Sequence, residues 1–151
     1  MASLDALISS LNTVANSLQK TTSVILKKQE RFIVRVLQRR LLEKGTDAND
    51  KLIGGGQYAE ATIRHKLFTG QTTSHFTLFD TGDFHKAMRV DLVGDMALIT
   101  SGDSKTSELM FRYGEDILGL TEEETDEAIR LFVDPLLQKE INSITPRVIK
   151  I

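Results

Sequence analysis

The sequence predicts an α+β domain in which a long N-terminal helix packs on a small antiparallel sheet and a C-terminal helix follows. Three observations support this fold class. Apolar residues recur every three or four positions over residues 1–44, a period of two appears between Met88 and Thr100, and a helix-capping signature begins at Thr121. With 151 residues, of which 40% are hydrophobic and 26% charged, the chain is most simply a single domain over residues 1–151.

The N-terminal helix is expected over residues 1–44. Its apolar stripe consists of residues spaced alternately by four and three: Leu4, Ile8, Leu11, Ala15, Leu18, Thr22, Ile25, Gln29, Phe32 and Val36. Hydroxyl side chains from Thr21 to Ser23 compete for backbone hydrogen bonds, so the stretch is either one helix or two helices separated there. An unbroken helix of this length spans about 60 Å, projects beyond its own core and packs against another subunit.

The second half of this helix is strongly basic. Its cations form the first part of the candidate interface: Lys27, Lys28, Arg31, Arg35, Arg39 and Arg40. A solvated cationic face is the simplest interpretation, and contact with an acidic partner surface or a nucleic-acid backbone is the alternative. The formal net charge of −2 gives no general attraction to nucleic acid or to an anionic membrane.

Residues 45–57 are expected to form a glycine-rich loop that leads into an α+β core over residues 58–143. Gly45 suits the end of the preceding helix, and the glycines at 54–56 suit a loop or hinge. No Gly-Lys-Ser/Thr signature follows these glycines, so nucleotide binding is not expected. A short helix is expected over residues 58–68.

The composition and the histidine spacing exclude several kinds of site. The chain has no cysteine, which excludes disulfides, thiolate metal sites and a cysteine nucleophile. His65, His75 and His85 are ten residues apart, which does not match the i, i+4 spacing of a helical zinc motif, so we expect no metal and no cofactor. Without a basic N-terminal region or an apolar run of about 18 residues, neither secretion nor a membrane partner is expected.

A β-hairpin is predicted between Met88 and Thr100. Apolar and charged residues alternate as far as Leu92, the two-residue loop Gly94-Asp95 begins with glycine, and an apolar strand follows. The next apolar segment, residues 108–113, is ambiguous, because its alternation is that of a strand but the segment is short.

The final helix is predicted from a capping box, in which Thr121 and Glu124 satisfy each other's backbone N–H groups. Pro135 predicts either a kink or a second helix with Asp134 as its N-cap. Residues 144–151 combine apolar and basic side chains, as in an edge strand or an arm that docks on a neighbouring molecule. The apolar residues of this arm complete the candidate interface: Val148, Ile149 and Ile151.

The triplet Asp80-Thr81-Gly82 has two interpretations. It resembles the catalytic Asp-Thr-Gly of retrovirus-type aspartic proteases, which need one aspartate from each subunit of a dimer. Alternatively, Asp80 and Thr81 end a loop and cap a short helix, while Gly82 allows a tight turn. The protease family is nearly all strand and has a small residue in place of Asp83, whereas more than half of this sequence has helical patterns. We therefore expect a structural turn and no catalytic residue.

A broader resemblance depends on the order of several motifs. Residues 78–84 read Leu-Phe-Asp-Thr-Gly-Asp-Phe, a hairpin follows, residues 111–114 read Phe-Arg-Tyr-Gly, and residues 117–121 open the final helix. Over residues 58–142 this order resembles the virion-morphogenesis or tail-completion proteins of tailed bacteriophages. The chain departs from that family at residues 83–84, where a basic residue and leucine are usual, and it lacks the Pro-Ala-Arg-Pro type of turn before the last helix.

The resemblance implies a non-enzymatic structural role in head–tail joining or tail completion. Proteins of this kind assemble as rings around the DNA channel. The implied partners are therefore further copies of the chain, other neck, connector or tail proteins, and DNA passing nearby. The implied location is the virion, after synthesis in the host cytoplasm. Two alternatives remain: a helical partner-binding or regulatory domain, and a dimeric aspartic protease that uses Asp80.

Overall fold

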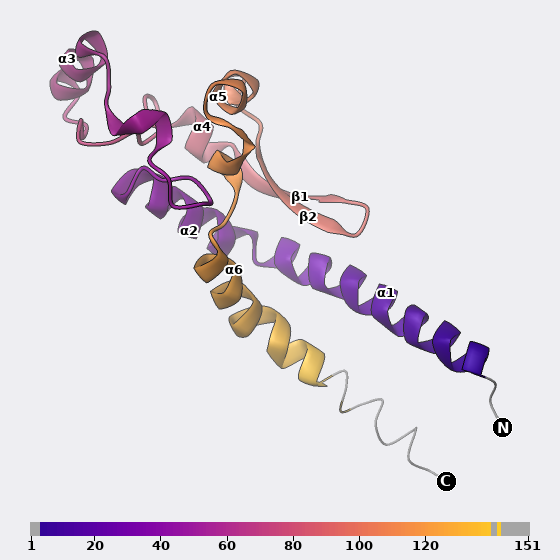
Figure 1. Cartoon of the computed structure of the whole chain (residues 1–151). Helices are drawn as coiled ribbons and strands as arrows, with labels where there is room; N and C mark the ends of the chain where they lie inside the picture. Colours follow the sequence, from indigo (N-terminus) through magenta and orange to yellow (C-terminus); the bar gives the residue numbers. More distant parts are fainter. Residues whose placement is uncertain (1–3, 140–141, 143–151) are drawn as a thin grey trace.

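Helices dominate the structure, and the long N-terminal helix α1 extends well beyond the body formed by the other elements (Figure 1). The computed structural model describes residues 4–139 and residue 142. In this part of the chain the helices are combined with one two-stranded antiparallel sheet, so the predicted α+β class is confirmed. None of the described helices has both the length and the hydrophobicity that a bilayer span requires.

The N-terminal helical segment changes direction at Gln29. Helix α1 covers Leu4–Lys28 and α2 covers Glu30–Glu43. Thr22 and Ser23 remain inside α1, because their hydroxyl groups donate to backbone carbonyl oxygens of the preceding turn. Of the two alternatives for this stretch, a break between Thr21 and Ser23 is therefore excluded. The interruption lies at Gln29, whose ψ of 17° departs from the helical value.

Helix α2 belongs to the core. It buries one stripe of side chains: Ile33, Val36, Leu37, Arg40 and Leu41. Leu37 and Leu41 join a cluster of buried side chains from the following segments: Ile53, Phe84, Met88, Ile117 and Leu118. Gly45 follows the end of α2 with a positive φ of 65°, as expected for a helix-terminating glycine.

The middle of the chain contains three short helical elements. They are η1 (Ile53–Gly56), α3 (Glu60–Phe68) and α4 (Asp83–Lys86). The glycines of η1 have positive φ angles, 60° at Gly54 and 72° at Gly55, so this turn requires residues without a Cβ. Helix α3 confirms the helix predicted over residues 58–68.

The predicted hairpin is confirmed. Strands β1 (Met88–Val93) and β2 (Met96–Ser101) pair in antiparallel register, with Val93 opposite Met96 across the two-residue loop. The ambiguous segment after the hairpin is helical, not extended: α5 covers Thr106–Tyr113. Phe111, one of its alternating apolar residues, is exposed to solvent.

The final helical segment begins with the predicted capping box at Thr121, which is present in full. After η2 (Glu115–Leu118), helix α6 covers Glu122–Ala128 and passes into a π-helical turn, η3 (Ile129–Val133). Residues 134–139 are helical.

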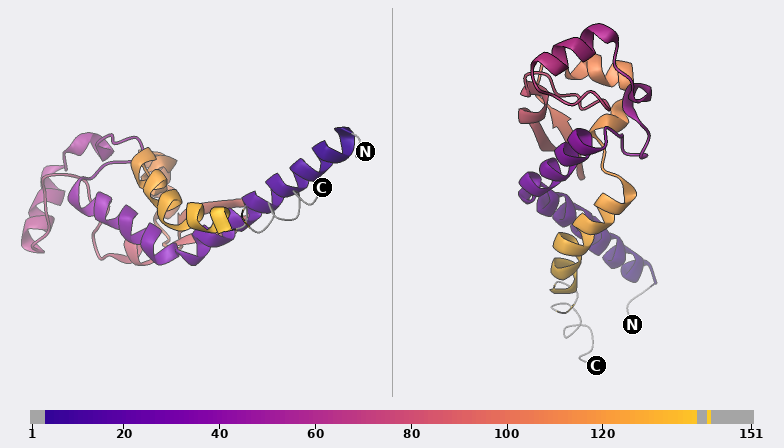
Figure 2. Two further views of the ribbon diagram at one scale, coloured as in Figure 1. Left: turned by 90° about the horizontal axis from the view of Figure 1, so that it is seen from below. Right: turned by 90° about the vertical axis from the view of Figure 1, so that its left-hand side faces the viewer.

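Of the two alternatives at Pro135, a second helix with Asp134 as its N-cap is excluded. Asp134 has helical dihedral angles, and its N–H donates to the carbonyl of Ile129, five residues earlier. The wider π-helical turn therefore lies directly before Pro135, where the proline interrupts normal helical hydrogen bonding. In the views of Figure 2, α1 and this last helix both extend away from the body.

Candidate functional site

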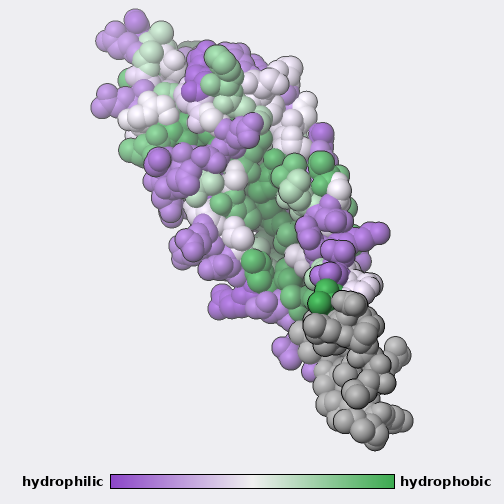
Figure 3. Space-filling model, turned by 45° about the vertical axis from the view of Figure 1, so that its right-hand side comes forward, coloured by the Kyte–Doolittle hydropathy of each residue, from purple (hydrophilic) through white to green (hydrophobic). Residues whose placement is uncertain are grey.

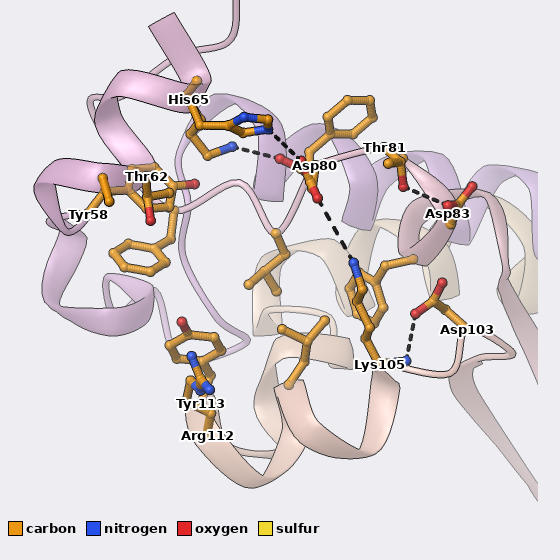
Figure 4. Close-up of a pocket in the computed structure, with 18 residues that line it drawn as sticks. Tyr58, Thr62, His65, Asp80, Thr81, Asp83, Asp103, Lys105, Arg112 and Tyr113 are labelled. Carbon is orange, nitrogen blue, oxygen red and sulfur yellow. Dashed lines mark hydrogen bonds and ion pairs between the residues drawn. The ribbon is translucent and has the colours of Figure 1, made fainter. Parts of the chain in front are cut away.

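The Asp80-Thr81-Gly82 triplet lines a cavity of about 540 Å³ whose walls come from α3, α4 and α5 (Figure 4). Its interior is largely apolar and aromatic: Tyr58, Phe76, Leu78, Phe84, Leu109 and Tyr113. The ring of Tyr58 stacks on Phe76 with centroids 4.2 Å apart, and Tyr113 meets Phe76 edge-on at 5.7 Å. One side of the cavity is therefore formed by aromatic rings that pack on one another, and its rim is polar.

Lys66 fixes one wall of this cavity. It is only 5% exposed, and its ammonium group donates to the carbonyl oxygen of Phe79 at 2.6 Å and to the side chain of Gln71 at 2.8 Å. Its Nζ also lies 4.9 Å from the centre of the Tyr58 ring. Neutral oxygens and an aromatic face thus solvate a buried cation and attach the loop before Asp80 to α3.

Thr77 is the second anchor of the loop. Its N–H donates to the hydroxyl of Tyr58 at 2.9 Å, and its carbonyl oxygen lies 2.8 Å from Nε2 of His85. Burial lowers the pKa of His85 below its usual value, because the imidazolium form is poorly solvated, although the Thr77 carbonyl opposes this shift. The neutral imidazole therefore donates to Thr77 from Nε2 at neutral pH.

Asp80 lies at the rim of the cavity, between His65 and Lys105 (Figure 4). Its Oδ1 is 3.2 Å from Nε2 of His65, and its Oδ2 is 4.0 Å from Nζ of Lys105. All three side chains are more than half exposed, so water screens both contacts. Through these two contacts Asp80 connects His65 on α3 with Lys105 at the start of α5.

Asp80 and Thr81 do not cap a helix, so that prediction is wrong. The N-cap of α4 is Gly82 itself, and no side chain of the described residues caps this helix. Thr81 instead donates to the carboxylate of Asp83 at 2.6 Å. The turn predicted at Gly82 is confirmed by its φ of 88°, a value that favours glycine.

The charged groups beside Asp80 come from two different helical segments. Within the described residues of this chain they are the imidazole of His65 and the ammonium group of Lys105. The site is an apolar hollow whose rim carries both acidic and basic side chains. A hollow of this kind suits an apolar side chain of a partner.

The three evenly spaced histidines point to different partners. His65 contacts Asp80, His75 contacts the carbonyl oxygen of Leu42 at 2.7 Å, and His85 contacts Thr77. Across the described ranges, 4–139 and 142, no group of three potential metal-ligating side chains is found.

The basic candidate interface at the end of α1 and along α2 divides into exposed and buried members. Lys28, the last residue of α1, is exposed, and so are Arg31, Arg35 and Arg39 on the side of α2 opposite its buried stripe. Arg40 is only 3% exposed and forms an ion pair with Glu124, so its assignment to an exposed interface is wrong. Arg40 lies seven residues, or about two helical turns, after Ile33. It therefore shares the buried face of α2 with Ile33.

Lys27 is also bound within the chain. Its Nζ contacts both Glu30 and the carbonyl oxygen of Val90 on β1, and Glu30 accepts from the Val90 N–H at 2.8 Å. The hydrogen bond from Lys27, followed by that from Val90, lowers the pKa of Glu30. These two side chains thus bind the outer edge of β1.

A second hollow, of about 660 Å³, lies between α1, the hairpin and α6. Its lining is mainly apolar and includes Leu26, Ile33, Ala97, Ile99, Leu118 and Ile129. A space-filling view shows a band of hydrophobic side chains along one face, with hydrophilic side chains on both sides (Figure 3). No motif in the sequence indicated this groove, since it combines residues from α1, α2, both strands, α5, η2 and α6.

The last candidate interface residues, Val148, Ile149 and Ile151, lie outside the described residues. Comparison of the chain with models of protein families, with curated proteins and with solved structures finds no match.

Proposed function

We propose that the protein is a structural virion subunit of a tailed phage, which joins copies of itself into a ring that acts in head–tail joining or tail completion. It acts through contact surfaces and without catalysis. The order of motifs over residues 58–142 supports the phage assignment, and the α+β fold with a long N-terminal helix is compatible with it.

The observation that supports self-assembly most directly is the exposure of large apolar side chains in two separate regions. The first region lies on α3 and α5, where Leu67 is 63%, Phe68 91% and Phe111 93% exposed. The second lies on the hairpin and the last helix: Leu92, Val93, Met96, Leu98, Ile129, Leu131 and Leu136. Such exposure is typical of surfaces that a partner covers.

Two different surfaces are what a ring requires. In a ring each subunit presents one surface to the preceding copy and another to the following copy, and rotation closes the series. A two-fold dimer would instead bury one self-complementary patch. The separation of the α3–α5 region from the hairpin region therefore favours a head-to-tail arrangement.

Helix α1 adds to this argument. Its exposed apolar side chains include Ile8 at 47% and Val14 at 40%, and this part of the helix lies beyond the body (Figure 1). An isolated helix gains little stability in water from propensity alone, so packing on a neighbouring copy would stabilise it.

The exposed cations at the end of α1 and along α2 provide a polar contact for the same assembly. Lys28, Arg31, Arg35 and Arg39 form a stripe of one sign on a chain whose net charge is −2. We infer that this stripe faces an acidic surface of a neighbouring protein in the junction.

Sedimentation tests the proposal over about a hundredfold range of protein concentration. We expect closed species of defined copy number, visible as rings by electron microscopy. The paired substitution Phe68→Ser and Phe111→Ser should shift these species toward monomer, while Thr69→Ser, an exposed neighbour, should not. A tight dimer without larger species would contradict the proposal. So would a monomer that antibody labelling does not detect at the neck or tail end of virions of a phage that encodes this chain.

A further inference from the structure

The outer edges of the two hairpin strands follow from the register. A two-residue loop makes Val93 and Met96 a hydrogen-bonded pair, and bonded and non-bonded pairs alternate along an antiparallel ladder. The backbone groups of Val90 therefore point outward from β1, and those of Ala97 and Ile99 point outward from β2. The contacts of Val90 with Lys27 and Glu30 agree with this geometry.

The outer edges of β1 and β2 differ in the hydrogen-bond partners of their backbone groups. Side chains of Lys27 and Glu30 occupy the outward carbonyl and N–H of Val90 on β1. For β2, no residue of the described chain forms a hydrogen bond with the outward backbone groups of Ala97 or Ile99. Edge strands are normally protected from pairing by charges, proline or bulges. The sequence of β2, Met-Ala-Leu-Ile-Thr-Ser, contains no charge and no proline, and its register contains no bulge.

The free edge of β2 lies at the apolar groove described above. Ala97, Leu98, Ile99 and Thr100 line this groove, together with Ile129 on the other side. An added strand would thus gain backbone hydrogen bonds from β2 and bury its side chains in the groove at the same time.

We propose that residues 146–151 of a neighbouring copy bind there as an added strand. This inference rests on the proposed self-assembly and identifies one of its contacts. Ile149 and Ile151 lie on the same side of an extended strand and enter the groove, whereas Lys150 faces water. The segment has six residues, as β2 does, and its β-branched Val148, Ile149 and Ile151 favour an extended conformation.

Charge favours this occupant over the β2 strand of a second copy. Asp95 precedes β2, Asp103 follows it, and Glu115 lines the groove. Residues 146–151 bring the cations Arg147 and Lys150 and no acidic side chain. Antiparallel pairing of two β2 strands would instead bring the Asp95 of one copy toward the Asp103 of the other.

Disulfide crosslinking between two differently marked copies tests the contact, since the chain has no cysteine of its own. One full-length copy carries Ala97→Cys, and the other carries Ile149→Cys, Lys150→Cys or Ile151→Cys. We expect crosslinked heterodimers after mild oxidation with substitutions at 149 and 151, and little with the substitution at 150, because alternate residues face opposite sides of a strand.

A second variant blocks the edge without removing the hairpin. Ala97→Pro deletes an outward N–H, so the bonds between β1 and β2 remain, and Ala97→Ser is the matched control that keeps this group. We expect Ala97→Pro to raise the concentration for half-assembly by about tenfold or more, which corresponds to 1.4 kcal/mol per tenfold. Deletion of residues 146–151 should have a similar effect, and Ala97→Ser should assemble normally.

The possible results separate this inference from the proposed function. If Ala97→Pro and the deletion both assemble as the wild type does, the added strand is refuted while the ring stands. Crosslinking of Ala97→Cys copies to one another would show that β2 pairs with β2, which also refutes it. If the wild type forms no assembly and no heterodimer crosslink, both the ring and the added strand are wrong.

Discussion

Arg40 and Glu124 form an ion pair that ties α2 to the first turn of α6. The guanidinium group also donates to the carbonyl oxygens of Thr46 at 3.2 Å and Gly119 at 2.6 Å. Glu124 accepts at the same time from the backbone N–H of Thr121 at 3.0 Å, which completes the capping box. One arginine therefore connects the basic helix, the loop after it and the start of the last helix.

Arg40→Ala is expected to lower the free energy of unfolding by about 3 kcal/mol, because it leaves the largely buried carboxylate of Glu124 without a cation and two carbonyl oxygens without a donor. Urea denaturation at neutral pH measures this change. Arg39→Ala, one residue away and exposed, is the control and should change the free energy by less than about 0.5 kcal/mol. Equal effects of the two substitutions would refute a special role for Arg40.

Glu30 contributes to stability in a pH-dependent way. Its pKa in the folded protein is lowered from the ordinary 4.5, chiefly by the hydrogen bond from Lys27 and then by that from Val90. The contribution is therefore complete above pH 4.5 and is lost as the pH falls through the lowered pKa.

Because the Glu30 side chain is about a third exposed, Glu30→Gln should cost only roughly 0.5 kcal/mol at neutral pH. Urea denaturation of both proteins at a series of pH values should show the difference disappearing in acid. Glu43→Gln, exposed on the same helix, provides the control. A difference that persists unchanged at the lowest pH would contradict this assignment.

The elements that were predicted from the sequence are those with local signals. The hairpin followed from its alternation and glycine-first loop, and the capping box followed from Thr121 and Glu124, because these patterns act over a few residues. The sequence left open whether the helix breaks at Thr21 to Ser23, because hydroxyl groups can compete with the helix or bond within it, as they do here. Gln29 carries no sequence signal for the observed interruption.

The candidate site was less predictable, because its parts come from distant segments. The triplet at Asp80 marked the correct loop, but its contacts with His65 and Lys105 depend on the packing of α3 and α5. Lys66 looks like any surface lysine in the sequence, and only the fold places its ammonium group among carbonyl oxygens. Arg40 was predicted in the exposed interface, although its spacing of seven residues from Ile33 places it on the buried stripe of α2.

His85 should make the protein less stable in mild acid. Burial lowers its pKa below 6.5, so the unfolded chain takes up a proton before the folded protein does, and stability falls as the pH drops below 6.5. Urea denaturation between neutral pH and pH 5 measures the decline. His85→Gln keeps a donor for Thr77 and should lack this component, whereas His65→Gln should retain it. If the free energy of unfolding of His85→Gln fell by the same amount in mild acid, the decline would come from other titrating groups.

Two glycine substitutions separate the cost of backbone conformation from that of steric contact. Gly70 and Gly82 both have positive φ, but a Cβ at Gly70 meets nothing within 4 Å, while one at Gly82 lies 2.9 Å from the Phe79 ring. Gly70→Ala should therefore cost about 1 kcal/mol. Gly82→Ala should cost roughly 1 kcal/mol more, because the ring must move. Thermal unfolding compares the two, and equal costs would mean that Phe79 moves freely.

Asp80→Asn tests the structural role of the triplet against the catalytic one. The carboxylate is 58% exposed and its contacts are screened, so the free energy of unfolding should change by less than about 0.5 kcal/mol. Peptide cleavage in acid, the condition that favours an aspartate dyad, should be absent from the wild type and from this variant alike. Asp83→Asn is the matched control, since Asp83 lies three residues away and its carboxylate bonds only to Thr81 among the described residues. Cleavage by the wild type that persists in Asp83→Asn and disappears in Asp80→Asn would overturn the non-enzymatic role, because only a carboxylate that takes part in the reaction would produce that difference.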